Sequence, residues 1–202
     1  MSHSYFLRSS SIDITPIRPV PLAAGYRGRN QPFVSINDPL EMNMILLGDG
    51  RAEIAILSAD LLFIGDFLRS KAEEILHPIE PQAILFAASP THFAPATEAM
   101  LSLLGKTDNE YLDYLVMRLA ELADKVRRSD PQVVQLKYFK TEASHSINRR
   151  RWALATLERH PYPRVKLNHM EMRPNPAGRR NETIHIVGFY AAEQKDCDPL
   201  QS

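Results

Sequence analysis

The sequence predicts the α/β class: a mixed β-sheet with helices packed against it, in a single domain. Short apolar runs of strand length alternate with two stretches whose apolar residues recur at helical spacing, which is typical of mixed layers. The chain has 202 residues, of which 44% are hydrophobic and 24% charged. This is the composition of one ordinary globular domain, and it excludes a fibre or a disordered tail.

The first elements are three predicted strands. Ser11–Ile14 alternates in polarity before Thr15-Pro16, which indicates an edge strand running into a loop. Met42–Leu47 and Ala52–Ser58 are apolar runs separated by a turn that contains Asp49-Gly50. Because Asp-Gly between strand-like runs favours a tight turn, these two runs are predicted to form a β-hairpin.

A helix and a further strand follow the hairpin. From Asp66 to His77 the apolar positions recur at helical spacing, and Pro78 ends the pattern. Ala83–Ala88 is an unbroken apolar run, which is typical of a strand covered on both faces. Strand, helix and strand with short links predict a βαβ unit.

The longest predicted helix begins after Asp108, whose side chain can cap it, and ends before Asp130-Pro131. Five apolar residues form one stripe along it, including Leu119. The full stripe is Tyr111, Leu115, Leu119, Leu122 and Val126.

Four elements are expected in the last third of the chain. Val134–Tyr138 alternates like a half-exposed strand, Arg149–Arg159 is consistent with a short helix, and Val165–Met172 and Thr183–Tyr190 are predicted strands. If the chain ends at Ser202, the last strand should lie near an exposed edge. The chain is then expected to self-associate or to require a partner segment.

Charge and cysteine content limit the function classes. Lys plus Arg and Asp plus Glu number 24 each, so bulk capture of nucleic acid or an anionic membrane is not expected, although a local basic patch is allowed. The single cysteine, Cys197, excludes an internal disulfide and a cysteine-based zinc module. No stretch has the length of a membrane span, the first residues lack a signal-peptide pattern, and a cytoplasmic location is expected.

His92 is the first candidate functional residue. It follows the most apolar predicted strand, and ligands of open α/β sheets bind at the carboxyl ends of strands. The loop holds it between Pro90 and Pro95, which should make its presentation stiff. The alternative is that this lone histidine is a structural or surface residue.

Asp60 is the second candidate, because it ends a neighbouring strand of the same βαβ unit and could orient the His92 imidazole. The alternative is that its side chain caps a backbone turn.

Arg149, Arg150 and Arg151 precede Trp152, and such a cluster could clamp a phosphate or a nucleic-acid base. The alternative is a solvated helix start. Arg149 could also act alone as a clamp for a carboxylate or an oxyanion.

The other histidines show no close ligand spacing, so no metal site is predicted from the residues themselves. Nucleotide-binding glycine motifs and a nucleophile elbow are absent as well.

Taken in order, several pieces resemble the N-terminal catalytic region of neutral/alkaline non-lysosomal ceramidases. Each piece is weak alone, but they stand in the family's order and spacing. They are Ile12-Asp13-Ile14-Thr15-Pro16, Ala24-Gly25-Tyr26, Ile56-Leu57-Ser58-Ala59-Asp60, Thr91-His92-x-x-Pro95 and Ile147-Asn148-Arg149.

The resemblance implies a zinc-dependent amidohydrolase that cleaves the N-acyl bond of a ceramide-like lipid. In the family loop T-H-T-H-S-G-P the first histidine binds zinc and the second faces the substrate. His92 matches the second histidine and Arg149 the family's active-site arginine, whereas Pro90 stands at the first and offers no donor atom. The family's other zinc ligands come from later sequence, so zinc is not expected to be bound by this chain alone.

Two functions of different classes follow. The leading hypothesis is a partial or degenerate ceramidase-like hydrolase domain over residues 1–202, acting on a small-molecule or lipid-like amide through His92, Arg149 and Asp60. The alternative is a non-catalytic binding module that retains an acyl or anionic ligand in the ancestral cleft. A third hypothesis, RNA binding through Arg149–Trp152, would require a steep salt dependence and is otherwise dropped.

Overall fold

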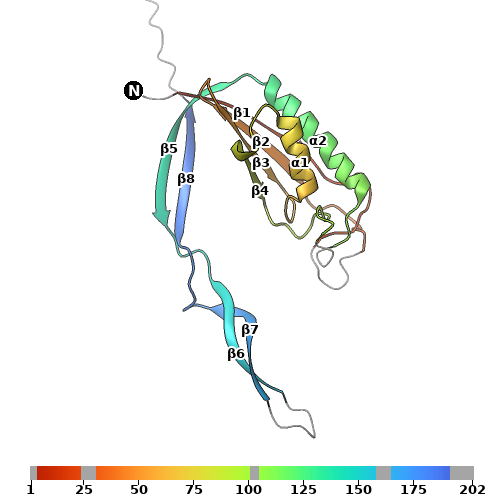
Figure 1. Ribbon diagram of the computed structural model, residues 1–202, viewed down its shortest axis with the longest axis vertical. Helices are drawn as coiled ribbons and strands as arrows, with labels where there is room; N and C mark the ends of the chain where they lie inside the picture. Colours follow the sequence, from red (N-terminus) through yellow and green to blue (C-terminus); the bar gives the residue numbers. More distant parts are fainter. Residues whose placement is uncertain (1–3, 24–30, 101–104, 158–164, 192–202) are drawn as a thin grey trace, which may run out of the picture. The chain divides into compact units, whose positions relative to one another are not determined.

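The computed structural model describes residues 4–23, 31–100, 105–157 and 165–191 (Figure 1). The mixed α/β class is confirmed, with two α-helices and a six-stranded sheet of order β4-β3-β2-β1-β5-β8. The elements are β1 (Tyr5–Asp13), β2 (Glu41–Gly48), β3 (Glu53–Ala59), α1 (Asp66–Leu76), the 3-10 turn η1 (Pro81–Ala83), β4 (Ile84–Ala88), α2 (Asn109–Arg128), β5 (Gln132–Glu142), β6 (Asn148–Leu157), β7 (Val165–Asn175) and β8 (Thr183–Ala191).

Contacts divide the chain into two compact units, residues 1–135 with 190–202, and residues 136–189. In the first unit β1, β2 and β3 pair antiparallel, and β3 pairs parallel with β4 across α1. The predicted hairpin and βαβ unit are therefore confirmed. The expectation that residues 1–202 act as one partial hydrolase domain stays a prediction.

The core of the first unit lies between the strands and the two helices. Met42, Met44 and Leu46 alternate along β2, and Leu57 lies opposite Met44 on β3. Side chains two residues apart point to the same face of a sheet, and the helices pack against this face. All four side chains are therefore buried. The predicted stripe of α2 is buried in full against this face, as is the apolar side of α1.

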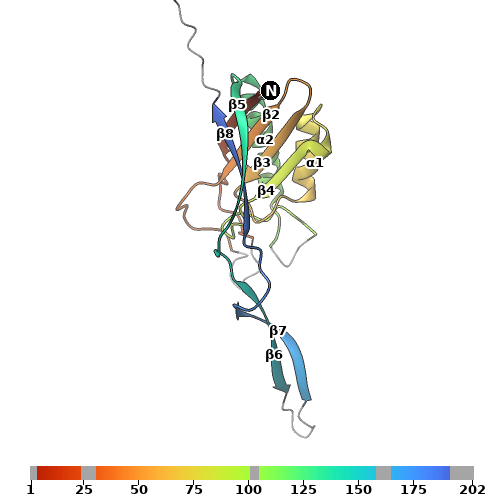
Figure 2. The same ribbon diagram turned by 90° about the vertical axis from the view of Figure 1, so that its left-hand side faces the viewer.

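The strand predicted at Ser11–Ile14 corresponds to the end of β1, which begins at Tyr5. β1 pairs with β2 from Phe6 to Asp13 but with β5 only at Tyr5–Leu7, so the predicted residues have one neighbouring strand. One expectation about strand position is wrong. The run Ala83–Ala88 forms β4, which is the last strand of the sheet and is not covered on both faces, since Leu85 is 55% exposed (Figure 2). A short apolar run indicates a strand, but it does not show whether that strand lies at the edge or in the centre of the sheet.

The second unit contains most of β5 and β8 together with the two-stranded ribbon β6–β7. The strands predicted around residues 134, 165 and 183 are confirmed, and β8 is last in the order of its sheet. The short helix expected at Arg149–Arg159 is wrong, because residues 148–157 pair antiparallel with β7. Paired residues of the two strands lie between 8 positions apart, for Leu157 and Val165, and 27 positions apart, for Asn148 and Asn175, where helical spacing cannot detect them.

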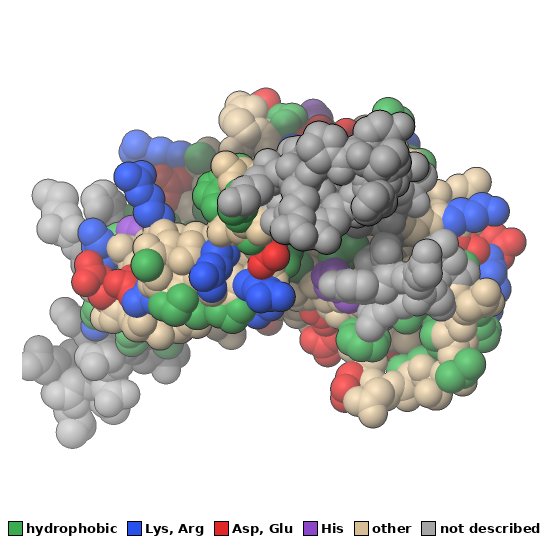
Figure 3. Space-filling view, turned by 90° about the horizontal axis from the view of Figure 1, so that it is seen from below, with side chains coloured by type: hydrophobic (Ala, Val, Ile, Leu, Met, Phe, Trp, Pro, Cys, Tyr) green, Lys and Arg blue, Asp and Glu red, His purple; other side chains and the backbone are tan. Residues whose placement is uncertain are grey.

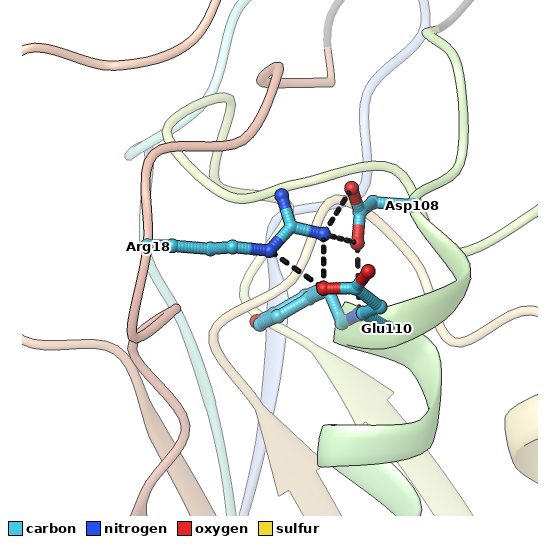
Figure 4. A network of polar contacts seen from close by, with 4 residues as sticks. Arg18, Asp108 and Glu110 are labelled. Carbon is cyan, nitrogen blue, oxygen red and sulfur yellow. Dashed lines mark hydrogen bonds and ion pairs between the residues drawn. The ribbon is translucent and has the colours of Figure 1, made fainter.

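The start of α2 is fixed by Asp108, as predicted. Its Oδ1 accepts a hydrogen bond from the backbone N–H of Tyr111 at 2.9 Å. Arg18 donates to both carboxylate oxygens of Asp108 at 2.9 Å and to Glu110 at 2.8 Å (Figure 4). These hydrogen bonds, that to Asp108 first, raise the pKa of the Arg18 guanidinium.

The helix-capping hydrogen bond of Asp108 is expected to contribute more to the free energy of unfolding than its ion pair with Arg18. Asp108→Ala should lower the free energy of unfolding by about 1 kcal/mol and at most about 2 kcal/mol. Asp108→Asn keeps an acceptor and should lose less, and Arg18→Ala, which removes only exposed ion pairs, should also lose less than Asp108→Ala. Urea denaturation measures all three. A larger loss in Arg18→Ala than in Asp108→Ala would contradict this order.

Candidate functional site

A cavity of about 610 Å³ opens in the first unit, where four strands end together. In the sheet register Asp13 lies opposite Glu41, Met42 opposite Ala59, and Ala59 opposite Ala88. The end of β1, the start of β2 and the ends of β3 and β4 therefore meet at one edge of the sheet. This is the edge at which the sequence predicted ligand binding.

The walls of the cavity are mostly apolar, with polar groups among them. The apolar lining is Pro16, Leu22, Phe33, Ile36, Pro39, Leu40, Phe93 and Pro95, and the polar lining is Thr15, Ser35, Asn37, Asp38, Asp60 and Thr91. Among these described residues two are acidic and none is basic. Ligand pockets for small molecules commonly combine apolar walls with a few placed polar groups.

Asp60 lines this cavity and also ties two strand ends together. Its Oδ2 accepts a hydrogen bond from the backbone N–H of Glu41 at 3.0 Å, and its own N–H donates to the Glu41 carbonyl at 2.9 Å. The hydrogen bond from the Glu41 N–H agrees with the alternative that the Asp60 side chain caps the backbone. The orientation of the His92 imidazole by Asp60 stays a prediction.

The loop after β4 is fixed at several points although it has no regular structure. The Ser89 N–H donates to the Ala59 carbonyl at 3.1 Å, and the Ala94 carbonyl accepts from the Ala23 N–H at 2.8 Å. Beyond the loop, the buried Thr97 hydroxyl donates to the Phe63 carbonyl at 2.7 Å. These bonds satisfy backbone groups that strands would otherwise pair, and they hold the loop against the sheet end.

Within that loop, Thr91 and Phe93 contribute to the cavity wall. His92 lies between them in a turn and is partly exposed, with its Nδ1 atom buried. It is not among the described residues that line the cavity, so its role as a site residue stays a prediction.

His92→Ala is expected to cost about 1 kcal/mol or less in unfolding free energy, because the side chain is partly exposed and lies outside the apolar core. Thermal unfolding of the two proteins measures this difference. A loss of several kcal/mol would identify His92 as a packing residue and remove the case for a functional one.

Glu98 connects the end of this segment to α1. Its carboxylate accepts from the Met100 N–H at 2.9 Å and from the Asp66 N–H, in the first turn of α1, at 3.1 Å. These two bonds, that from Met100 first, lower the pKa of the Glu98 carboxyl.

A lowered carboxyl pKa makes this contact sensitive to acid. The stabilisation is complete above the ordinary pKa of a glutamate and is lost as the pH falls through the lowered pKa of the folded state. We expect wild-type stability to fall more steeply on acidification than that of Glu98→Gln. Urea denaturation at neutral and acidic pH measures this, and equal slopes would contradict it.

Arg149 belongs to the second unit, at a β-bulge of β6, so its grouping with Asp60 and His92 stays a prediction. Asn148 orders the bulge, since its amide nitrogen donates to the Arg179 carbonyl and its oxygen accepts from the Arg150 N–H, both at 2.8 Å. Gly178 packs against Asn148, where a Cβ would come within 2.6 Å of the Asn148 side chain. Bulges commonly re-aim a side chain, which here is the exposed Arg149.

The segment 31–40 supplies much of the cavity lining and was not singled out from the sequence. A signal was present, since three apolar residues, Phe33, Val34 and Ile36, stand in a short stretch bounded by Pro32 and Pro39. In the structure Val34 is 98% exposed and Ile36 is 56% exposed. Ile36 lines the cavity, whereas Val34 is not among the described lining residues.

Two known structures have a similar fold. One is the neutral ceramidase from Pseudomonas aeruginosa, with a TM-score of 0.59 and 16% identity over 70% of this chain and 24% of that chain. Another, described as ceramidase complexed with C2, has a TM-score of 0.60 and 18% identity over 72% and 24%. The resemblance to neutral ceramidases therefore extends to the fold.

The chain spans about a quarter of the length of those ceramidases. No family model matches it, and no curated protein sequence does. Of the resembling pieces, Ala24-Gly25-Tyr26 lies outside the described residues.

Proposed function

We propose that this chain is a ceramidase-like amidohydrolase domain, corresponding to the N-terminal part of a ceramidase catalytic domain, and that it takes a lipid-like amide. One observation carries the proposal. Three segments that carry the sequence resemblance, represented by Thr15, Asp60 and Thr91, line one cavity although they are far apart in the chain. The ceramidase-like fold supports the same assignment.

The chemistry of the cavity suits a neutral amide with an acyl chain. Side chains such as Phe33 and Phe93 offer apolar surface for hydrocarbon, and Thr15 and Thr91 carry hydroxyls that can bond an amide or a head-group hydroxyl. The carboxylates of Asp38 and Asp60 disfavour an anionic group, because no basic residue is among the described lining residues.

Roles for His92 and Asp60 come from the resemblance together with their positions. His92, next to the cavity wall, would face the scissile amide and exchange a proton with it. The resemblance alone gives Arg149, which belongs to the second unit, the part of the family's active-site arginine. Asp60 would orient the polar end of the substrate while holding the ends of β2 and β3 together.

Zinc, which the resemblance implies, does not fit the residues present. The described part of the chain contains no group of three His, Cys, Asp or Glu side chains that could hold a metal ion. Pro90 has no donor atom at the position of the family's first zinc histidine. No step is therefore assigned to a metal, and we expect the purified chain to retain no stoichiometric zinc after dialysis.

The second candidate is a binding module that holds an acyl ligand in the same cavity without cleaving it. One observation favours it, namely that the Asp60 carboxylate is engaged by the backbone of Glu41. The anionic ligand considered from the sequence is less well supported, because of the acidic lining.

Fatty-acid release distinguishes the two candidates. The full chain is incubated with N-acylsphingosine, with and without added zinc, and the free acid is quantified by mass spectrometry; elemental analysis gives the zinc content. Release that is lost in both His92→Ala and Arg149→Ala supports the hydrolase. Binding without release identifies the binding module, and neither binding nor release rejects both. One tightly held zinc per chain would contradict the expected metal content.

A further inference from the structure

The ribbon β6–β7 exposes an apolar face. In an antiparallel pair, residues directly opposite each other share a face of the ribbon. One face carries Trp152, which is 69% exposed, Leu154 at 59%, Met170 at 42% and Met172 at 68%. The opposed pairs on this face are Arg150 with Met172, Trp152 with Met170 and Leu154 with Asn168.

The other face of the ribbon is charged. Glu171 lies opposite Arg151, forms an ion pair with Arg173 at 3.2 Å, and has a carboxylate oxygen 3.2 Å from the Nε2 atom of His169. The ribbon is therefore amphipathic. Four large apolar side chains are exposed on one side, and contiguous exposed apolar patches commonly mark interaction sites.

Charge is strongly divided along the chain. Residues 136–189, the second unit, contain eleven Lys and Arg against four Glu and no Asp, a net charge of +7. The remaining residues contain 13 basic against 20 acidic side chains, a net charge of −7. The zero net charge of the whole chain thus conceals a basic unit, and Figure 3 shows Lys and Arg side chains exposed beside hydrophobic ones.

We infer that the apolar face of β6–β7 docks on an anionic lipid surface. Trp152, Leu154, Met170 and Met172 would enter the boundary between head groups and acyl chains, and Arg150, on the same face, would lie among the anionic head groups. Arg151, on the opposite face of the thin ribbon, would add its charge within about a Debye length of the surface. The long aliphatic stems of arginine allow this arrangement, because they cover apolar surface while the guanidinium stays in water.

Interface size favours lipid over a second protein. Four side chains on a two-stranded ribbon offer a few hundred Å² at most, whereas a stable protein interface buries about 1,200 Å² or more in total. A bilayer does not need that area, since each basic residue near an anionic surface adds to the attraction independently. In the described residues no helix has the length and apolarity to cross a membrane. This inference does not depend on the proposed hydrolysis.

Trp152 is the only tryptophan in the chain, so its fluorescence reports on the ribbon directly. The full chain is mixed with vesicles of phosphatidylcholine alone and with vesicles containing 30% phosphatidylserine, and co-sedimentation gives the partition coefficient. We expect a shift of emission to shorter wavelength and partitioning only with the anionic vesicles. Both should weaken steeply as salt rises from ~0.05 to ~0.5 M.

Matched variants separate the two contributions. Arg150→Ala with Arg151→Ala should lower partitioning about thirtyfold, which is about 2 kcal/mol at about 1.4 kcal/mol per tenfold. Met172→Ala should also lower it, whereas Met117→Ala, at an exposed methionine of α2, should not. Circular dichroism confirms that each variant is folded.

Three results would overturn the inference. The first is an unchanged Trp152 spectrum with anionic vesicles, and the second is equal partitioning to both vesicle types. The third is the same spectral shift in the absence of lipid. If the shift accompanies a doubling of the mass measured by light scattering, the face binds a second copy of the chain. If it requires added single-stranded RNA, the face binds nucleic acid.

Discussion

Replacing Leu119 with alanine is expected to lower the free energy of unfolding by about 2 to 5 kcal/mol. Leu119 lies in the middle of α2 with no exposed surface, in the core that joins both helices to the sheet. Truncation removes its transfer free energy and leaves a cavity that a close-packed core closes only in part. Since a domain is stable by only about 5 to 15 kcal/mol, this is a large fraction of the total.

Met117→Ala is the matched control, because Met117 stands on the same helix but is 50% exposed. It should change stability by about 0.5 kcal/mol or less. Urea denaturation of both variants decides the point. Equal losses would mean that α2 does not pack on the sheet in the observed register.

Gly65→Ala is expected to cost about 1 to 3 kcal/mol and also to weaken ligand binding. A Cβ at Gly65 would lie 2.4 Å from the Thr97 carbonyl oxygen and 3.1 Å from the Glu98 carboxylate. The Thr97 backbone would have to move, and with it the Thr97 hydroxyl, whose hydrogen bond to the Phe63 carbonyl anchors the segment that follows the loop after β4. A substitution at Gly65 should therefore change both the free energy of unfolding and the affinity of the cavity for its ligand.

Gly50→Ala serves as the control for this coupling. Gly50 has a φ of +86° in the turn between β2 and β3, with open space around the missing Cβ, so alanine there should cost about 1 to 2 kcal/mol by backbone strain alone. Stability falls in both variants, but affinity for an acyl ligand should fall only in Gly65→Ala. Unchanged stability and affinity in Gly65→Ala would contradict the tight contact.

Local patterns predicted the elements of the first unit well. Asp49-Gly50 between apolar runs and the capping residue Asp108 each act through neighbours in the chain, and both elements form as predicted. The predictions that failed concern features set by strands distant in the sequence. The position of β4 at an edge and the pairing of residues 148–157 with β7 are set by strands that no local pattern contains.

The candidate site was predictable where it depends on strand order, and was not predictable where it depends on an irregular loop. Strand order placed Asp60 and the loop of His92 at one end of the sheet, where the cavity lies. The contribution of Phe33 and Ser35 was missed, because their segment has no regular structure and reaches the site only in three dimensions. The basic charge of the second unit was hidden by an exactly compensating acidic remainder of the chain.

The central claim is that the cavity holds an acyl amide, and calorimetric titration of the full chain with a short-chain N-acylsphingosine tests it most directly. Phe93→Ala removes a wall residue that is 67% exposed, and Phe67→Ala removes a 42% exposed phenylalanine of α1 outside the described lining. We predict saturable binding that Phe93→Ala weakens about tenfold and Phe67→Ala leaves unchanged. No saturable binding, or an equal loss in both variants, would contradict the assignment of this cavity.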